Sequence, residues 1–159
     1  MKVNFKLSDW TYMEYNEFLN SFSNQKFREA GHLIEKIVKD WSMFEGIPTD
    51  ALHPFDHLPL EDATAMIHAI QNNAKSYIDE LDTSDDVTVD LSNWKWHDFN
   101  IFQEAISNNN TEKAVNMMLE VSRLKKGHPK SIETLNAVQG MVLMQALSLK
   151  IQKVFSAKN

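Results

Sequence analysis

Residues 7–22 read LSDWTYMEYNEFLNSF, and residues 91–106 read LSNWKWHDFNIFQEAI. The two stretches align without a gap when the chain is shifted by 84 positions, so that Trp10 meets Trp94 (94 − 10 = 84). Nine identities occur between positions 3 and 30 at this shift. Because repeats set the architecture of a chain, we predict an internal duplication. The alternative is chance similarity between amphipathic helices, which share periodicity but need not share Trp, Asn and Ser at fixed positions.

The similarity continues at a second shift further along the chain. His53 meets His128, and Leu60 meets Leu135, at a shift of 75 (135 − 60 = 75). The difference between the shifts (84 − 75 = 9) predicts nine additional residues in the first copy. We therefore predict one repeat over residues 1–82 and a second over 83–159. Each repeat alone would be marginally stable, so we expect both to pack about a pseudo-twofold axis into one compact unit.

Apolar residues recur at spacings of three and four in both repeats, which predicts amphipathic helices. Asp9 and Asn93 precede the first helix of each repeat and are the predicted N-caps. The second helix is expected to extend over 27–41, and the third begins after Pro59, a residue that suits a first turn. The final helix is expected from about 131 to 155. The predicted fold class is therefore all-α, with two three-helix units forming one six-helix bundle.

Two short segments alternate apolar and polar residues instead. They read VNFKL at 3–7 and VTVDL at 87–91. Period-two alternation with β-branched residues predicts strands. Under the pseudo-twofold axis, these strands are expected to pair with each other as a two-stranded antiparallel ribbon that lies on the helices.

The composition restricts the classes of function. The chain of 159 residues has 16 basic and 22 acidic residues, for a net charge of −6, and no cysteine. Nucleic-acid binding needs a basic face, so we expect no nucleic-acid partner. The lack of cysteine excludes disulfides and thiolate metal sites. The longest apolar-rich run, MVLMQALSL at 141–149, is too short to span a bilayer, and no signal peptide is recognisable. We expect a cytoplasmic protein with no membrane partner.

No catalytic or cofactor motif is present. The chain has no G-x-S-x-G, phosphate-binding or dinucleotide-binding glycine pattern. His53, Asp56 and His57 contain the residue types of a metal site, but Pro54 makes this segment a loop and the H-E-x-x-H signature is missing. We therefore predict a protein that is not an enzyme, with no catalytic residue, cofactor or metal.

Two apolar features predict contact with a partner. The last helix is apolar around nearly all of its circumference, which is typical of a central helix or of an interface. The segment 41–57 carries several apolar side chains in a loop, where they either pack onto the body of the protein or form a docking surface. The candidate partner-binding residues are Trp41, Phe44, Ile47, Phe55, Leu143, Met144 and Leu147.

Three segments of the first repeat carry a resemblance to a known group of proteins. They are LSDWTYMEYNEF at 7–18, WSMFEGIP at 41–48 and LPLEDA at 58–63. Together they resemble small helical tail assembly chaperones of tailed bacteriophages. The resemblance covers about half of the first repeat, whereas the second repeat has KKGHPKSIETL in place of the latter segments. The matching residues are Trp41, Phe44, Gly46, Pro48, Leu58 and Pro59.

The resemblance implies a protein that holds the tape measure or tail tube protein in the host cytoplasm until assembly. The predicted function is therefore a non-enzymatic protein–protein interaction, in a viral assembly chaperone or adaptor, with a phage tail protein or a second copy as partner. One alternative is a small acidic inhibitor that binds a host enzyme. A second alternative is a metal- or small-ligand-binding helical protein that uses the loop at 53–57.

Overall fold

The computed structural model describes residues 3–80 and 86–157. These residues form mainly α-helix, with one two-stranded antiparallel sheet, so the prediction of a mainly all-α fold with a short ribbon is confirmed. Short 3-10 turns η1, η2 and η4 precede α1, α3 and α6. The elements are η1 Leu7–Asp9, α1 Tyr12–Ser23, α2 Phe27–Ile34, η2 Pro54–His57, α3 Leu60–Glu80, β1 Val87–Val89, α4 Trp96–Ser107, α5 Thr111–Val121, β2 Ser122–Leu124, η4 Ile132–Thr134 and α6 Ala137–Ser156.

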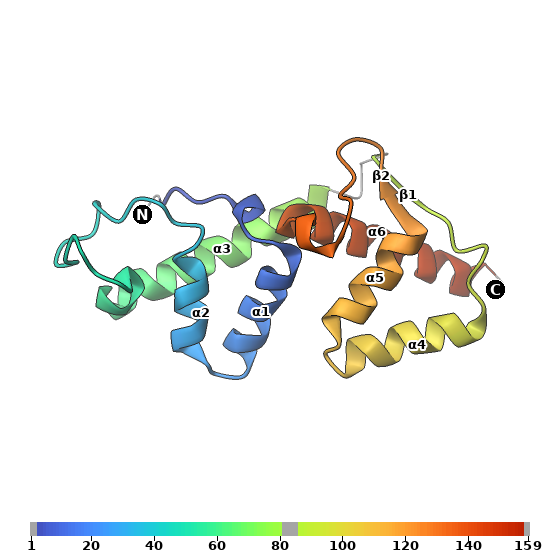
Figure 1. Cartoon of the computed structure of the whole chain (residues 1–159), viewed down its shortest axis with the longest axis horizontal. Helices are drawn as coiled ribbons and strands as arrows, with labels where there is room; N and C mark the ends of the chain where they lie inside the picture. Colours follow the sequence, from blue (N-terminus) through green and yellow to red (C-terminus); the bar gives the residue numbers. More distant parts are fainter. Residues whose placement is uncertain (1–2, 81–85, 158–159) are drawn as a thin grey trace.

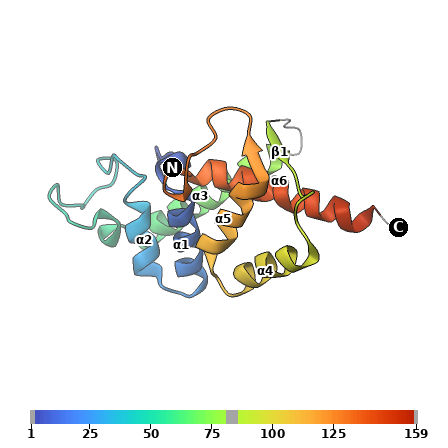
Figure 2. The same ribbon diagram turned by 45° about the vertical axis from the view of Figure 1, so that its right-hand side comes forward.

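The helices form two hairpins and a pair of long helices (Figure 1). α1 and α2 make one hairpin, α4 and α5 make the other, and both lie on the same side of α3 and α6. α3 and α6 follow one another along the long axis of the molecule, which the rotated view in Figure 2 also shows. α6 contacts elements from both halves of the chain, namely α1, α3, α5 and both strands. It is therefore the helix that joins the two hairpins.

α6 combines the two roles that its apolar sequence predicts. Its first part is buried, with Gly140, Leu143 and Leu147 inside the protein. Its last turn leaves Val154 and Phe155 about half exposed. The helix is thus central over most of its length and has a free apolar surface at its end.

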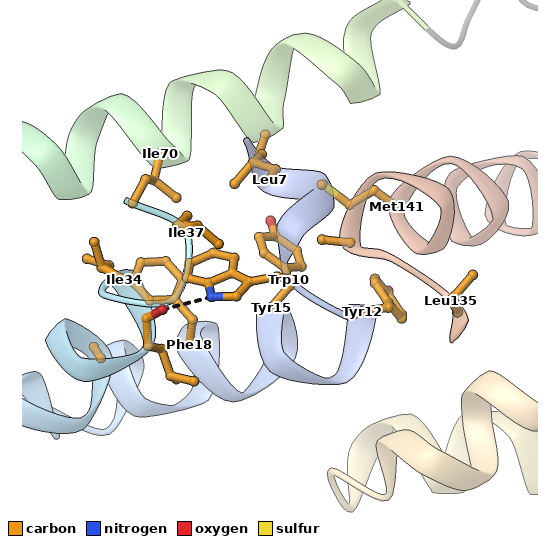
Figure 3. Close-up of a cluster of buried hydrophobic side chains, with 14 of the residues drawn as sticks. Leu7, Trp10, Tyr12, Tyr15, Phe18, Ile34, Ile37, Ile70, Leu135 and Met141 are labelled. Atoms are coloured by element: carbon orange, nitrogen blue, oxygen red, sulfur yellow. Dashed lines mark hydrogen bonds between the residues drawn. The ribbon is translucent and has the colours of Figure 1, made fainter. Parts of the chain in front are cut away.

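Trp10 is at the centre of the core in the first half. Its side chain has no exposed surface, and its ring packs on Phe18 with a centroid distance of 5.1 Å. The indole N–H donates a hydrogen bond of 2.8 Å to the Leu33 carbonyl, drawn as the dashed line in Figure 3. A buried indole thus finds the polar partner that it needs. Trp10 fixes the segment before α1 against α2.

α1 begins later than the sequence predicts. Thr11 is its N-cap: the Thr11 hydroxyl accepts the Glu14 N–H, and the Glu14 carboxylate accepts the Thr11 N–H, both at 3.1 Å. This is a capping box, which satisfies two otherwise unpaired donors. The prediction of Asp9 as N-cap is wrong, because Asp9 ends the 3-10 turn η1 and the chain is then extended at Trp10 and at Thr11, which bridges to Asn136. α4 likewise begins three residues after Asn93, not directly after it.

The predicted pairing of the two alternating segments is also wrong. β1 pairs with β2, with Val89 opposite Ser122, and Phe5 forms an isolated bridge with Val38. Each segment therefore pairs with the chain that leaves the second helix of its own half. A short hairpin brings that chain back to the segment, and closing a shorter loop costs less conformational entropy.

The end of α2 and the start of α6 differ from the predictions for related reasons. α2 ends at Ile34 instead of continuing to 41, because Val38 is needed in the bridge with Phe5. α6 begins at Ala137 instead of near 131. Asn136 caps it by accepting the Gln139 N–H at 2.9 Å. Tertiary pairing and a local cap decide both boundaries.

Several features recur at the shift of 84. α1 and α4 have equivalent bounds (96 − 12 and 107 − 23 both give 84), and the two bridges are equivalent (89 − 5 and 122 − 38). Gln25 and Asn109, also 84 apart, have positive φ angles of 60° and 56° in the turns after α1 and α4. These correspondences agree with the predicted duplication, which stays a prediction.

The long helices follow a different shift from the one that the sequence suggested. α3 begins at 60 and α6 at 137, so their starts are 77 positions apart (137 − 60 = 77), not 75. At 77, buried Met66 meets buried Leu143 and buried Ile70 meets buried Leu147. Burial thus corrects the alignment by two residues.

The buried residues of both halves form one cluster that includes Trp10, Met66, Met118 and Leu147. A division of the chain between residues 82 and 83 stays a prediction, since that position lies outside the described residues. The segment 81–90, where the two predicted repeats meet, is described only from Asp86 onward.

Candidate protein-binding groove

An apolar groove lies between the start of α4 and the end of α6. Both helix ends lie near the C-terminus of the chain (Figure 1). The volume of the groove is about 650 Å³. We call it the α4–α6 groove. Its apolar lining consists of Val89, Leu91, Trp94, Trp96, Phe99, Ile151, Val154 and Phe155.

Three aromatic rings meet at this groove. Phe155 packs edge-on against Trp96 with a centroid distance of 6.2 Å and lies 5.3 Å from the ring of Phe99. Trp96 is 66% exposed and Phe155 is 54% exposed. Exposed clusters of aromatic side chains on soluble proteins mark interaction sites, because Trp and large apolar anchors provide most of the binding energy at interfaces.

The rim of the groove carries charge. Lys95 and Lys150 line it, together with Asp90. The Ser92 hydroxyl and backbone N–H both donate to the Asp90 carboxylate, which lowers the pKa of Asp90, and Lys150 acts in the same direction. The rim therefore carries two cations and one anion on a chain whose net charge is −6. An apolar segment with acidic residues would complement it.

The equivalent face of the first half is closed. At the shift of 84, Leu91, Trp94, Trp96 and Phe99 correspond to four residues that are all buried. The first half thus contains the same arrangement of apolar side chains, but none of the four is more than 9% exposed. The four buried residues are Leu7, Trp10, Tyr12 and Tyr15.

The start of α6 closes this face. The Tyr12 N–H donates to the Leu135 carbonyl at 2.8 Å, and the Ala137 N–H donates to the Trp10 carbonyl at 2.9 Å. The first turns of α6 then lie over the Tyr12 ring, close enough that a side chain at Gly140 would overlap it (Figure 3). No described segment covers the second half in this way, which leaves the α4–α6 groove open.

The structure locates the predicted partner-binding residues elsewhere. Leu143 and Leu147 have no exposed surface, so in the folded chain they are core residues, not contacts for a partner. Phe44 is nearly buried as well, and Met144 lines a smaller cavity beside Tyr12. The other three are partly buried against the core, namely Trp41, Ile47 and Phe55. None of the seven predicted residues lines the α4–α6 groove.

The groove residues carried a weaker signal in the sequence. Trp94 belongs to the repeated phrase, where an anchoring role in the core is the natural interpretation. Val154 and Phe155 end a helix whose apolar surface predicts an interface over its whole length. Only the exposed fractions separate the buried part of that helix from its free end.

A polar cluster connects the segment 41–57 to α2. The rings of His32 and His53 stack at 3.7 Å, with 12° between their planes. Glu35 accepts the Phe55 N–H and bonds His53 Nδ1, both at 2.9 Å. His32 Nε2 lies 3.3 Å from an Asp56 oxygen. The structure thus brings His53 and Asp56 near His32 and Glu35, and none of these contacts involves His57.

This cluster has the residue types of a metal site but not its geometry. Ligand atoms of His32, Glu35 and His53 lie within 4.8 Å of one another. A metal ion binds imidazole along the nitrogen lone pair, which lies in the ring plane. Two rings stacked face to face do not direct their lone pairs at one ion. The arrangement holds the loop by hydrogen bonds, and we assign no metal to it.

Replacing Glu35 by alanine tests this role. The half-buried Phe55 N–H loses its acceptor, so we expect the free energy of unfolding to fall by about 1–2 kcal/mol. Hydrogen–deuterium exchange should accelerate over residues 41–58. Glu45→Ala, a change at an exposed position in the same loop, is the control and should leave exchange unaffected. Equal exchange in both variants would show that Glu35 does not hold the loop.

Comparisons with protein-family models, curated proteins and solved structures find no match for this chain. Across residues 3–80 and 86–157, no helix has both the length and the apolar character needed to cross a membrane. The fold and the α4–α6 groove are therefore the basis for the functional argument.

Proposed function

We propose that this protein acts without catalysis, by binding another protein through the α4–α6 groove. The observation that carries the proposal is the contrast between the two halves. The first half buries its aromatic face under α6, whereas the second half leaves the equivalent face open to solvent. Leaving large apolar side chains in water is unfavourable by about 25 cal/mol per Å², so a partner that covers them gains this energy.

Within this class we favour an assembly chaperone or adaptor, similar to the tail assembly chaperones of bacteriophages. The basis is the resemblance over residues 7–18, 41–48 and 58–63. A chaperone of this kind keeps an aggregation-prone segment covered until assembly, and an apolar groove with a charged rim suits that task. Inhibition of a host enzyme is the rival role of the same binding class.

The test compares a groove variant with a matched variant. Tagged wild-type protein, Trp96→Ala and Phe27→Ala are each incubated with lysate of the natural host, and quantitative mass spectrometry identifies the captured proteins. Phe27 is 53% exposed on α2, outside the groove. Truncating a central aromatic anchor costs at least about 2 kcal/mol, so we expect Trp96→Ala to reduce capture by about 30-fold. Phe27→Ala should capture as wild type does.

The identity of the captured protein separates the roles. A viral structural protein supports the chaperone, and a host enzyme supports the inhibitor. Capture that does not respond to Trp96→Ala would contradict the assignment of the groove. Circular dichroism and thermal unfolding of both variants verify that they are folded.

A further inference from the structure

We infer that a second copy of this chain occupies the α4–α6 groove, docking through the corner at residues 58–63, where η2 leads into α3. The two copies associate head to tail. This inference rests on the proposed function in one respect, namely that the groove is a protein-binding surface.

The molecule itself supplies the template for the contact. In the first half, two backbone hydrogen bonds hold residues 135–137 against the aromatic face, and the first turns of α6 pack on that face up to residue 140. The bonds use the carbonyl of Leu135 and the N–H of Ala137, on either side of Asn136. A segment that fills the open groove in the same manner needs a leucine carbonyl, a free N–H two residues later and a helix that starts there.

The start of α3 meets these requirements. At the shift of 77, Leu58 corresponds to Leu135, Leu60 to Ala137 and Ala63 to Gly140. Pro59 takes the position of Asn136. The Asn136 N–H donates to the Gln139 side chain within the capping box of α6, and not to the aromatic face. The missing N–H of proline is therefore no obstacle. Ala63 keeps a small side chain where Gly140 approaches the ring.

Both surfaces have the unpaired groups that such a contact would use. Leu60 is 79% exposed, so its side chain is accessible to a second molecule. Among the described residues, neither the Leu58 carbonyl nor the Leu60 N–H has a backbone partner, and the same holds for the Trp96 N–H and the Trp94 carbonyl. Across the proposed contact, the Trp96 N–H would donate to the Leu58 carbonyl and the Leu60 N–H to the Trp94 carbonyl. The first half and α6 are joined by the equivalent two bonds.

The charges are complementary as well. The first turn of α3 contains Glu61 and Asp62, whereas the first turn of α6 has no acidic residue. The rim of the groove has Lys95 and Lys150. Opposite charges at the edge of an interface direct the two surfaces into register. The acidic turn therefore suits the groove better than it would suit the closed face.

The two surfaces lie at opposite ends of the long axis. Figures 1 and 2 both show the start of α3 at one end, and the start of α4 with the end of α6 at the other. One copy cannot bring both ends together. A contact between different surfaces is heterologous, and it produces a ring or an open filament.

The test uses two variants that each destroy one surface. Trp96→Asp blocks the groove and Leu60→Asp blocks the corner; both positions are exposed, so the fold should be retained. Analytical ultracentrifugation measures the mass of each protein and of a 1:1 mixture. We expect wild type to form dimers and larger species as concentration rises, and each variant to remain monomeric. The mixture should form dimers only, because it contains one intact groove and one intact corner.

A charge exchange provides a second measurement. Lys150→Glu should weaken association, and addition of Glu61→Lys in the same chain should restore it in part. Larger effects at low salt are expected because screening is weaker there.

Three results would overturn the inference. They are wild-type protein that is monomeric at about 1 mM, a mixture that stays monomeric, and variants that each still self-associate. The proposed function has a separate test. If wild type is monomeric while capture of another protein still depends on Trp96, the groove binds a partner and the second copy is not its occupant.

Discussion

Replacing Trp10 by alanine is expected to lower the free energy of unfolding by about 3–5 kcal/mol. The side chain is completely buried, and its removal leaves a large cavity beside Phe18. The Leu33 carbonyl also loses the indole N–H that it accepts at 2.8 Å. That carbonyl keeps the Lys36 N–H at 3.1 Å, so the lost indole hydrogen bond adds a smaller term to the cost of the cavity.

Urea unfolding followed by circular dichroism measures this loss, and the chain contains its own control. Trp96→Ala removes the same side chain from an exposed position, so we expect a loss below about 1 kcal/mol. Both variants replace a tryptophan by alanine, so the comparison reports the effect of burial. Similar losses for Trp10→Ala and Trp96→Ala would contradict the description of the core.

Replacing Gly140 by alanine is expected to destabilise the protein by about 2–3 kcal/mol. A methyl group there would lie 2.1 Å from the nearest Tyr12 ring atom and 2.7 Å from the Tyr12 Cβ. The Cβ cannot move without its backbone, and that backbone is bonded to Leu135. The substitution therefore pushes the start of α6 away from α1, against a gain of up to about 1 kcal/mol in helix propensity.

Gly31→Ala is the matched control in α2. There a methyl group would lie 2.3 Å from the ring of Phe55. Phe55 is only partly buried in a 3-10 turn, so its ring can swing aside, and we expect a smaller loss than for Gly140→Ala. Thermal unfolding of both variants measures the difference. Gly140→Ala with stability equal to wild type would mean that α6 does not seat on Tyr12 as described.

The contrast between the halves connects these predictions to function. Trp10 and Trp94 occupy equivalent positions, and each lies beside an equivalent phenylalanine, at 5.1 Å from Phe18 and 5.5 Å from Phe102. Only Trp10 is closed over by another segment. The difference arises because the chain has two equivalent aromatic faces, and the start of α6 covers the one in the first half. The uncovered face is the one to which we assign binding.

Most of the candidate site was not accessible from the sequence. The apolar pattern of the last helix predicts either a core or an interface, and only the structure shows that Leu143 and Leu147 are completely buried. Periodicity locates an apolar surface on a helix, but it does not tell which length of that helix a neighbour covers. Likewise, His53 and Asp56 stood out, whereas their partners His32 and Glu35 are about 20 residues away in sequence.

The sequence by itself determined the helical class, the approximate helices and the repeated aromatic phrase, because helix periodicity and burial preference are local properties. Tertiary structure decided the boundaries and the pairing. Thr11 instead of Asp9 caps α1 because the backbone beside it is bonded to the start of α6. Each strand segment pairs within its own half because the shorter loop costs less entropy. It also decided which aromatic face is open. That depends on a contact between residues 10–12 and 135–137, more than 120 positions apart, and no local pattern encodes such a contact.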